Sequence, residues 1–473
     1  MVVRLFHKGR PGAMEVVMKR ANIPALFRRA TRSWFWILCA DIYPALVAAC
    51  IPWSTTAVAV FMVIWIVVLV PTIDPRAFLN SLRQPAYFLP VAFFALVFLG
   101  TLWADAPWPE RLHGISPAAK LLVIPFLLYH FERSKRDHWV FAGFLLSCAV
   151  LLSASWAVLY VPQWRMTHWA VAGVPIKNTI DQSQEFALCV FALVPLALAL
   201  FNQRWFALAA ACAALIFAFL ANLMFVALAR TSLVYMPVLL LLFAFRYLGR
   251  RAALALVSGT IVAVVVVWFA SPYLRQRVEG AALEYQEYRD VHEVTSTGER
   301  LEWWRRSLGF ISEAPLLGHG TGSIKQLFDR DTPRRTGKWT DPVENPHSQT
   351  LNVAIQWGIL GCLILYAMWY FHLLLFGASG LPAWIGLIVV VQNFVSSLFN
   401  SHLFDFTEGW IYVLGVGVAG GMAASKSLAK DKIPDARRIG VTITAVALLM
   451  FFVLTAGFVG LVGAFVQAIR WVI

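Results

Sequence analysis

Long apolar stretches dominate this 473-residue sequence and constrain its fold more than any other feature. About 20 apolar residues in a helix cross a bilayer, so each stretch is a candidate membrane span. The sequence is 60% hydrophobic and 14% charged, a composition foreign to soluble domains. It predicts an all-α polytopic membrane protein with 12 or 13 transmembrane helices; 117–131, which is short and contains Lys120, decides between the two counts. The runs are 34–52, 54–73, 86–104, 117–131, 139–161, 183–201, 205–228, 231–248, 251–271, 347–371, 381–401, 408–424 and 439–468.

Basic residues gather in alternate short loops of the predicted topology. The basic segments all fall on one side of the membrane: 1–33, 74–84, 132–138, 246–251 and 425–438. Because Lys- and Arg-rich short loops stay in the cytoplasm, we expect a cytoplasmic N-terminus, with anionic membrane lipid as the partner of its basic residues. No apolar h-region precedes the first run, so we expect no cleaved signal peptide. This asymmetry accounts for the +14 net charge, and no nucleic acid is expected as a partner.

The loop lengths divide the chain into four parts. Residues 1–33 form the cytoplasmic N-terminus, and 34–271 the first transmembrane bundle of about nine spans. By the same alternation 272–346 is external, and it contains two helix-like stretches, 274–293 and 298–313, the second beginning near a Thr/Gly cap. We expect a small folded helical cap there, followed by the C-terminal transmembrane helices in 347–473.

A histidine precedes one predicted span, in "ENPHSQTLNVAIQWGILG". Asn345 is a good N-cap and Pro346 suits the first helical position, which places His347 in the first turn. The helix dipole there attracts phosphate and disfavours a protonated imidazole. His347 is therefore a candidate general base beside an anion site. The alternative is an interfacial residue that only caps the span.

Other polar groups collect on the external side. Arg230, at the junction of two spans, is costly unless it is paired, snorkelling or facing a cavity. Arg300 lies at the start of an amphipathic helix and is a candidate site residue; the alternative is that it only lies on the solvated face of that helix. For Arg305 this alternative is the stronger one. Lys177 and Asn178 are interfacial anchors or substrate contacts. The polar residues that follow them, Asp181, Gln182, Gln184 and Glu185, suggest a polar cavity.

Several signatures are absent from the sequence. There is no His-Glu-x-x-His, no Asp-x-Asp and no clustered His/Cys spacing, so we expect no metal. There is no P-loop or dinucleotide fingerprint, so no nucleotide and no cofactor are expected. The six cysteines lie in apolar stretches and are interpreted as core thiols. Two arginines and a helix N-terminus can hold a pyrophosphate without a metal, while a neutral histidine deprotonates a sugar hydroxyl.

Four motifs between about residues 220 and 365 resemble the O-antigen ligase and polymerase superfamily of bacterial envelopes. They are Arg230 in "LARTSLV", Arg300 in "STGERLEWW" (with Glu299 as an extra residue), Pro315, Gly318 and Gly320 in "SEAPLLGHGTGS", and His347, Ser348, Leu351, Gly358 and Gly361. The resemblance implies a GT-C-like fold in the bacterial inner membrane and metal-independent, inverting glycosyl transfer at the periplasmic face. It implies Arg230 and Arg300 as pyrophosphate contacts and His347 as the base.

Within that superfamily the sequence favours the ligase. The resemblance implies an undecaprenyl-pyrophosphate-linked glycan as donor, with lipid A–core as the ligase's acceptor and another repeat unit as the polymerase's. Polymerases carry two sizeable external loops, whereas 162–182 is only about 20 residues here. The predicted substrate contacts are Lys177, Asn178, Asn345, Ser348 and Arg305. A lipid-linked glycan transporter is the other alternative, although such proteins usually show paired intramembrane ions or inverted repeats, and a scaffold would not need Arg230.

Overall fold

The computed structural model of the chain describes residues 34–134, 136, 138–166, 171–291, 295–331 and 342–428. Within them the secondary structure is helical, without a strand, which confirms the all-α class. The α-helices are α3 (Trp34–Cys50), α4 (Thr55–Leu69), α5 (Pro75–Ser81), α6 (Pro85–Leu99), α7 (Trp108–Ala119), α8 (Val123–Phe131), α9 (His138–Tyr160), α10 (Thr179–Asn202), α11 (Phe206–Phe225), α12 (Ser232–Tyr247), α13 (Arg250–Ala270), α14 (Pro272–Val291), α15 (Ser296–Glu313), α16 (Ile324–Asp331), α17 (Gln349–Leu375), α18 (Leu381–Ser396) and α19 (Phe406–Leu428).

Fewer of these helices are full-length spans than the hydropathy pattern predicts. Seven in the described residues are long and apolar enough to cross a membrane, or eight if α5 and α6, bent by 88°, count as one. The continuous helical stretch Trp108–Phe131, which contains the doubtful run 117–131, is among the seven. Three apolar runs form shorter helices instead: α3, α12 and α18. The expected span 439–468 lies outside the described residues. The membrane class is confirmed, but the count of 12 or 13 exceeds the described full-length spans.

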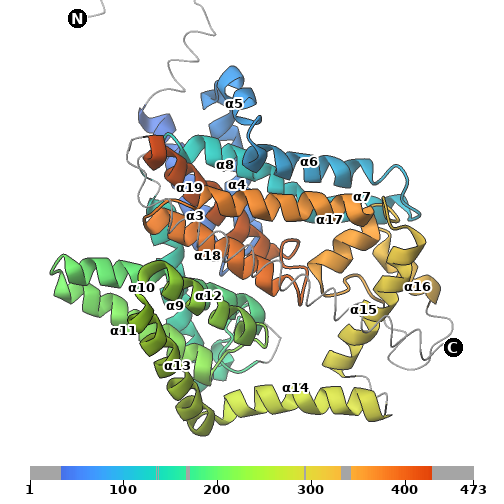
Figure 1. The fold of residues 1–473 in the computed structure, drawn as a ribbon. Helices are drawn as coiled ribbons and strands as arrows, with labels where there is room; N and C mark the ends of the chain where they lie inside the picture. The colour runs from blue at the N-terminus through green and yellow to red at the C-terminus, as the bar shows by residue number, and fades with distance from the viewer. Residues whose placement is uncertain are drawn as a thin grey trace, which may run out of the picture.

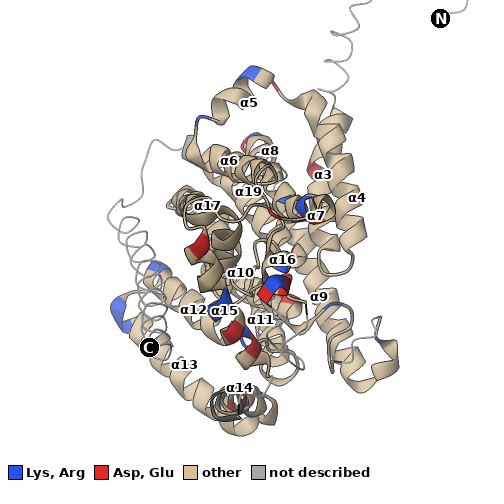
Figure 2. Cartoon of the chain, turned by 90° about the vertical axis from the view of Figure 1, so that its right-hand side faces the viewer, with Lys and Arg blue, Asp and Glu red and all other residues tan. Residues whose placement is uncertain are grey.

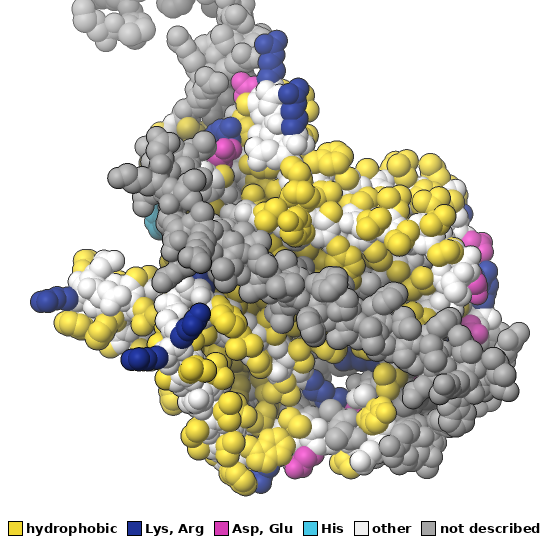
Figure 3. All heavy atoms as spheres, viewed as in Figure 1, with side chains coloured by type: hydrophobic (Ala, Val, Ile, Leu, Met, Phe, Trp, Pro, Cys, Tyr) yellow, Lys and Arg dark blue, Asp and Glu magenta, His cyan; other side chains and the backbone are white. Residues whose placement is uncertain are grey.

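The helices form two groups joined by α18. In Figure 1, α10–α13 lie together at the lower left, while α6, α8, α17 and α19 lie above them. Trp384 of α18 reaches the first group, because its indole N–H donates to the carbonyl of Phe191 at 2.7 Å. Hydrophobic side chains cover most of the face drawn in Figure 3, as a lipid-facing surface requires.

The segment predicted to be external contains both predicted helices, α14 and α15. Thr295 is the N-cap of α15, and its hydroxyl accepts a hydrogen bond from the Gly298 N–H at 3.1 Å. A separate small core lies under α15 and α16, with Phe310, Leu327 and Phe328 buried in it. Figure 1 shows α14 at the edge of the molecule, joined to α13 at one end and leading to α15 at the other.

Two glycine motifs meet where this segment packs on α17. Gly358 interrupts α17 with φ 60° and ψ −154°, and Gly318 has φ 66°. A Cβ at Gly318 would lie 2.4 Å from the backbone of Gln356, and a Cβ at Gly358 would lie 2.4 Å from the backbone of Leu316. The peptide groups exposed by the break are used, since Gly320 N–H donates to the Gln356 carbonyl at 2.8 Å. The two motifs therefore form one joint that fixes α15 relative to α17.

Candidate functional site

His347 lies just before α17 and outside its first turn. The helix begins at Gln349 with Ser348 as N-cap, and His347 has a left-handed φ of 53°. The Asn345 side chain accepts a hydrogen bond from the His347 N–H at 2.9 Å, and a second from the Ser401 hydroxyl at 2.7 Å. The prediction that Asn345 caps α17, with Pro346 in its first turn, is wrong. The physical reason is local: an Asn oxygen that bonds the N–H two residues on makes a turn that competes with the helix.

The imidazole of His347 is held by two contacts, and its loop by a third. Its Nδ1 lies 2.7 Å from Oδ1 of Asn400, whose amide nitrogen donates to Oδ2 of Asp405 at 2.8 Å. One ring face stacks on Trp303 of α15, with centroids 5.1 Å apart and planes 21° apart. Trp304 ties α15 to the same loop, because its Nε1–H donates to the carbonyl of Pro346 at 3.0 Å.

These contacts decide which ring nitrogen of His347 carries the proton. The Asp405 carboxylate only accepts, so it must face the NH₂ group of Asn400, and the Asn400 oxygen then faces His347. That oxygen needs a donor, so Nδ1 bears the hydrogen and Nε2 keeps its lone pair. In the neutral ring, Nε2 is thus the nitrogen able to take a proton from a substrate.

Burial lowers the pKa of His347, and the positive charge of Arg300 lowers it further; the Asn400 hydrogen bond and the charge of Asp405 act the other way. The expected neutral imidazole agrees with this direction, although the cause is different. The sequence analysis attributed it to a helix dipole, whereas His347 lies outside the helix, in a buried place near a guanidinium.

Arg230 forms a bidentate ion pair with Glu284 of α14. Its two terminal nitrogens lie 2.8 and 2.6 Å from the two carboxylate oxygens. Thr297 also holds Glu284, with its hydroxyl at 2.7 Å and its N–H at 3.2 Å from Oε2. These hydrogen bonds, that of Arg230 first, lower the pKa of Glu284 to about 2, and the same contact raises the pKa of Arg230. Arg230 is therefore paired, one of the alternatives considered for it.

Arg300 lies near Arg230, Glu284 and His347 without a direct contact to them. Burial lowers the pKa of its guanidinium, and the charge of Arg230 lowers it further, partly offset by Glu284. It makes no hydrogen bond with the residues that the structure describes. In Figure 2, ribbon segments of basic and acidic residues lie close together at α14, α15 and α16. Glu284 forms its ion pair with Arg230, and Glu284 and Glu299 act on Arg300 only through their charge, so positive charge remains near the imidazole.

The other predicted contacts lie in different environments. Lys177 donates to the Thr407 hydroxyl at 2.7 Å and to the carbonyl of Ile51, and Asn178 caps α10, accepting from the Ile180 and Asp181 N–H groups at 2.8 and 2.9 Å. Ser348 is buried at the N-cap of α17. Arg305 is 58% exposed and pairs with Glu302 at 2.9 Å, which matches the solvated alternative. Of these residues, Asn345 and Ser348 are beside His347.

The sequence analysis missed Asn400, Asp405 and Glu284. The stretch "FNSHLFDFTEGW" carried a usable signal, since it places polar residues at the junction of two predicted spans, as at Arg230. Trp303 and Trp304 lie in the motif "STGERLEWW", but nothing in the sequence linked them to His347. No signal in the sequence pointed to Glu284, because α14 carries acidic residues at several positions.

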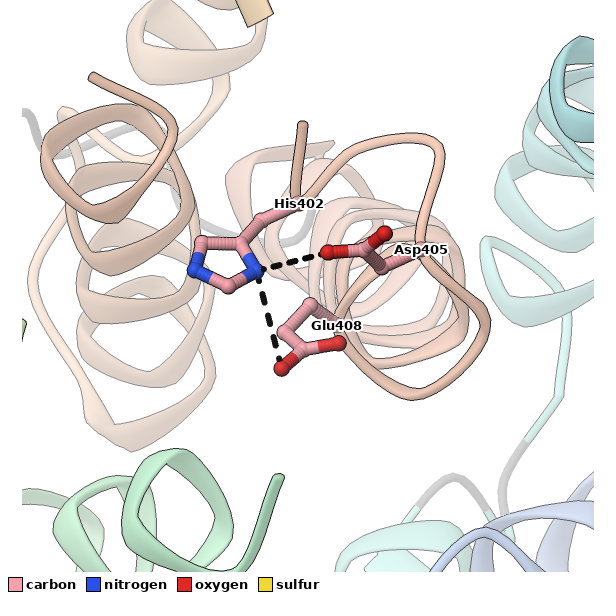
Figure 4. A group of neighbouring side chains, drawn as sticks. All are labelled: His402, Asp405 and Glu408. Atoms are coloured by element: carbon pink, nitrogen blue, oxygen red, sulfur yellow. Dashed lines mark hydrogen bonds and ion pairs between the residues drawn. The ribbon is translucent and has the colours of Figure 1, made fainter. Parts of the chain in front are cut away.

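Asp405 also belongs to a second group of polar side chains. His402, Asp405 and Glu408 offer ligand atoms within 4.8 Å of one another, drawn in Figure 4. His402 Nδ1 lies 3.1 Å from Asp405 Oδ2 and 3.6 Å from Glu408 Oε1. Asp405 already accepts from Asn400, and Lys120 donates to the carbonyls of Phe404, at 2.9 Å, and Asp405. Hydrogen bonds within this group, with Asn400 and with the Lys120 ammonium thus account for the close approach of these side chains, and we assign no metal to them.

Comparisons with known proteins bear on the middle of the chain. No curated protein matches the sequence. The family model described as O-antigen ligase matches residues 215–366, a region that contains Arg230, Glu284, Arg300, Trp303 and His347. The resemblance drawn from the four motifs is confirmed for this region. Residues 215–366 of this polytopic membrane protein thus match the model of the O-antigen ligase family.

Proposed function

We propose that the protein is an O-antigen ligase of the bacterial inner membrane. It transfers a glycan from undecaprenyl pyrophosphate to lipid A–core at the periplasmic face. The observation that supports this most is the His347 environment: a base with its free nitrogen fixed by Asn400 and its pKa lowered by burial and by the charge of Arg300. The proposed site lies between the helical cap, 272–346, and the transmembrane helices.

The first part of the proposed reaction is donor binding. Arg230 and Arg300 hold the pyrophosphate, because guanidinium groups bind phosphate oxygens in pairs and stay charged. Their charge stabilises the pyrophosphate as it leaves, when negative charge develops on its bridging oxygen. This task needs fixed positive charge, so the proposed reaction uses no metal and no cofactor.

The second part is acceptor activation. An acceptor hydroxyl donates its proton to Nε2 of His347 as its oxygen attacks the anomeric carbon from the face opposite the pyrophosphate. The new carbon–oxygen bond forms as the old one to phosphate breaks, so the configuration inverts. Base catalysis of this kind contributes about 10²–10⁴-fold. Asn400 contacts the base and Asp405 contacts Asn400, so the two act as positioning residues.

The acceptor distinguishes the ligase from a polymerase, which would use the same donor and the same three residues. The short segment 162–182 favours the ligase. Lys177, Asn178, Asn345, Ser348 and Arg305 remain proposed substrate contacts, of which Asn345 and Ser348 are best placed.

The test is a reconstitution of the purified protein with lipid-linked glycan and either lipid A–core or a second repeat unit. Product on lipid A–core is expected, whereas elongation of the repeat unit alone would indicate a polymerase. His347→Ala should abolish transfer while His113→Ala, a change of an exposed histidine outside the site, should not. Transfer that requires added divalent cation, or that survives His347→Ala, would contradict the proposal.

A further inference from the structure

An apolar cavity of about 520 Å³ lies inside the helix bundle, lined by α3, α9, α10, α18 and α19. Its wall is made mostly of aliphatic and aromatic side chains, and His138 is the one basic residue among those that line it. The volume falls in the range of sites that take a small molecule or part of a lipid. None of its lining residues belongs to the group around His347.

The cavity runs along the helices through about half of a membrane. On α19 it extends from Ile411 to Met422, roughly 16 Å at a rise of 1.5 Å per residue. The hydrocarbon core of a bilayer is about 30 Å thick, so this length corresponds to one leaflet. One end is at Ile51, whose carbonyl accepts from Lys177, and the other is at His138, the first residue of α9.

An unfilled space of this kind is costly, because its lining atoms lose dispersion contacts that a packed interior provides. Water does not fill an apolar cavity well, since it finds no hydrogen-bond partners there. The membrane supplies the alternative, a hydrocarbon chain. Ala142 and His138 of α9 line the cavity and are exposed, so a chain can enter along α9 from the surrounding lipid.

The His138 end of the cavity lies beside a basic turn. Arg136 donates to the buried carboxylate of Asp41 at 3.2 Å, which fixes the turn against α3. Arg133, whose side chain is 49% exposed, and the exposed His138 lie on either side of it. Arg133 pairs with Glu132 at 3.0 Å, but its guanidinium is exposed enough to contact a phosphate at the membrane surface as well, at the mouth of the cavity.

We propose that this cavity binds one acyl chain of a membrane phospholipid, with the lipid phosphate beside Arg133 and His138. The site is separate from the proposed donor site, because Met422 and His138 lie at the far end of α19 from Asp405 and His347. The bound chain replaces missing side-chain contacts between α9, α10 and α19. The proposal is independent of the proposed function, since it uses none of its residues.

Photo-crosslinking of the wild-type protein in nanodiscs tests the proposal. The probe is a phosphatidylglycerol with a diazirine near the middle of one acyl chain. Label is expected on peptides containing residues 138–145 and 411–422, and excess unlabelled phosphatidylglycerol should remove it. A polyprenyl phosphate with a diazirine in its chain is the second arm. Label from the polyprenyl probe alone, or a phospholipid label spread evenly over lipid-facing helices such as α13, would overturn the proposal.

A cavity-filling variant gives a second test. Ala192→Phe places a ring in the cavity, and Ala210→Phe, an exposed position on α11, is the matched control. Crosslinking of the phosphatidylglycerol probe to residues 138–145 and 411–422 should be lost in Ala192→Phe and retained in Ala210→Phe. Removal of lipid should lower the Tm of the wild-type protein, with recovery on adding phospholipid, and the Ala192→Phe Tm should respond less. Equal label in both variants would count against the cavity as the binding site.

Discussion

The candidate site has two sides that are built differently: the base side, which is His347 with Asn400 and Trp303, and the arginine side, which is Arg230 and Arg300 with Glu284. His347 has its ring face, one ring nitrogen and its backbone N–H all engaged by other residues. Arg230 is bound to a carboxylate of the protein itself, and Arg300 makes no hydrogen bond with the described residues. The base is thus pre-organised, whereas the arginines are completed only by an anion from outside. Variants on the arginine side should change affinity and charge stabilisation, and variants on the base side should change proton transfer.

The largest effect is expected from Arg300→Ala. Loss of one charge-stabilising donor costs about 10²–10³ in kcat in comparable sites. Stability should stay the same or rise slightly, because the variant removes a buried charge without breaking a hydrogen bond to a described residue. Steady-state kinetics and a thermal unfolding curve measure both. Arg330→Ala, on α16 and 53% exposed, is the control; equal losses in the two variants would exclude a special role for Arg300.

Asn400 tests the base side through pH dependence. The neutral imidazole is the active form, so activity falls as pH drops through the pKa of His347. Because that pKa is lowered, the acid limb of the profile should lie below the ordinary histidine value of about 6.5. Asn400→Asp places a carboxylate against Nδ1, favours the imidazolium and should move the acid limb to higher pH. Asn400→Ala should lower kcat about 10–100-fold, as loss of a positioning partner does elsewhere. An unmoved acid limb in Asn400→Asp would show that His347 is not the group that titrates.

Some residues of the site could be predicted from the sequence and others could not. Arg230, Arg300 and His347 stand out because each is costly or unusual where it lies along the chain. Asn400 lies 53 residues from His347 in sequence, and only the packing of the α18–α19 turn against the α17 start brings them together. The predicted start of α17 failed because local bonding by Asn345 competes with the helix. The predicted span count exceeds the number of full-length spans in the described residues, because hydropathy gives the length of an apolar run and not the length of the helix it forms.

The glycine joint connects the two sides, since α15 carries Arg300 and Trp303 and α17 follows His347. Gly318→Ala would strain a left-handed residue and push a Cβ into the Gln356 backbone. We expect a loss of about 2–4 kcal/mol in stability and a further loss of activity from displacement of α15. Gly309→Ala, on α15 with open space around its Cβ, should be neutral or stabilising. Thermal unfolding in lipid nanodiscs compares the two; similar Tm values would show that the joint is dispensable.

The smallest effect is expected from Glu284→Gln, the variant that asks whether the protein's own carboxylate competes with the donor. Glu284 occupies both terminal nitrogens of Arg230, so a pyrophosphate must displace it or share the remaining N–H groups. The neutral amide is a weaker competitor, and the donor KM should fall by about a factor of ten or less, with inorganic pyrophosphate becoming a stronger inhibitor. The pKa of about 2 keeps Glu284 ionised down to strongly acidic pH, so its stabilising contact is lost only as pH falls toward that value and does not vary between pH 5 and 8. A pH-independent change in KM is therefore expected. A lower kcat with unchanged KM would instead assign Glu284 to positioning of Arg230, and the arginine side would then be as pre-organised as the histidine side.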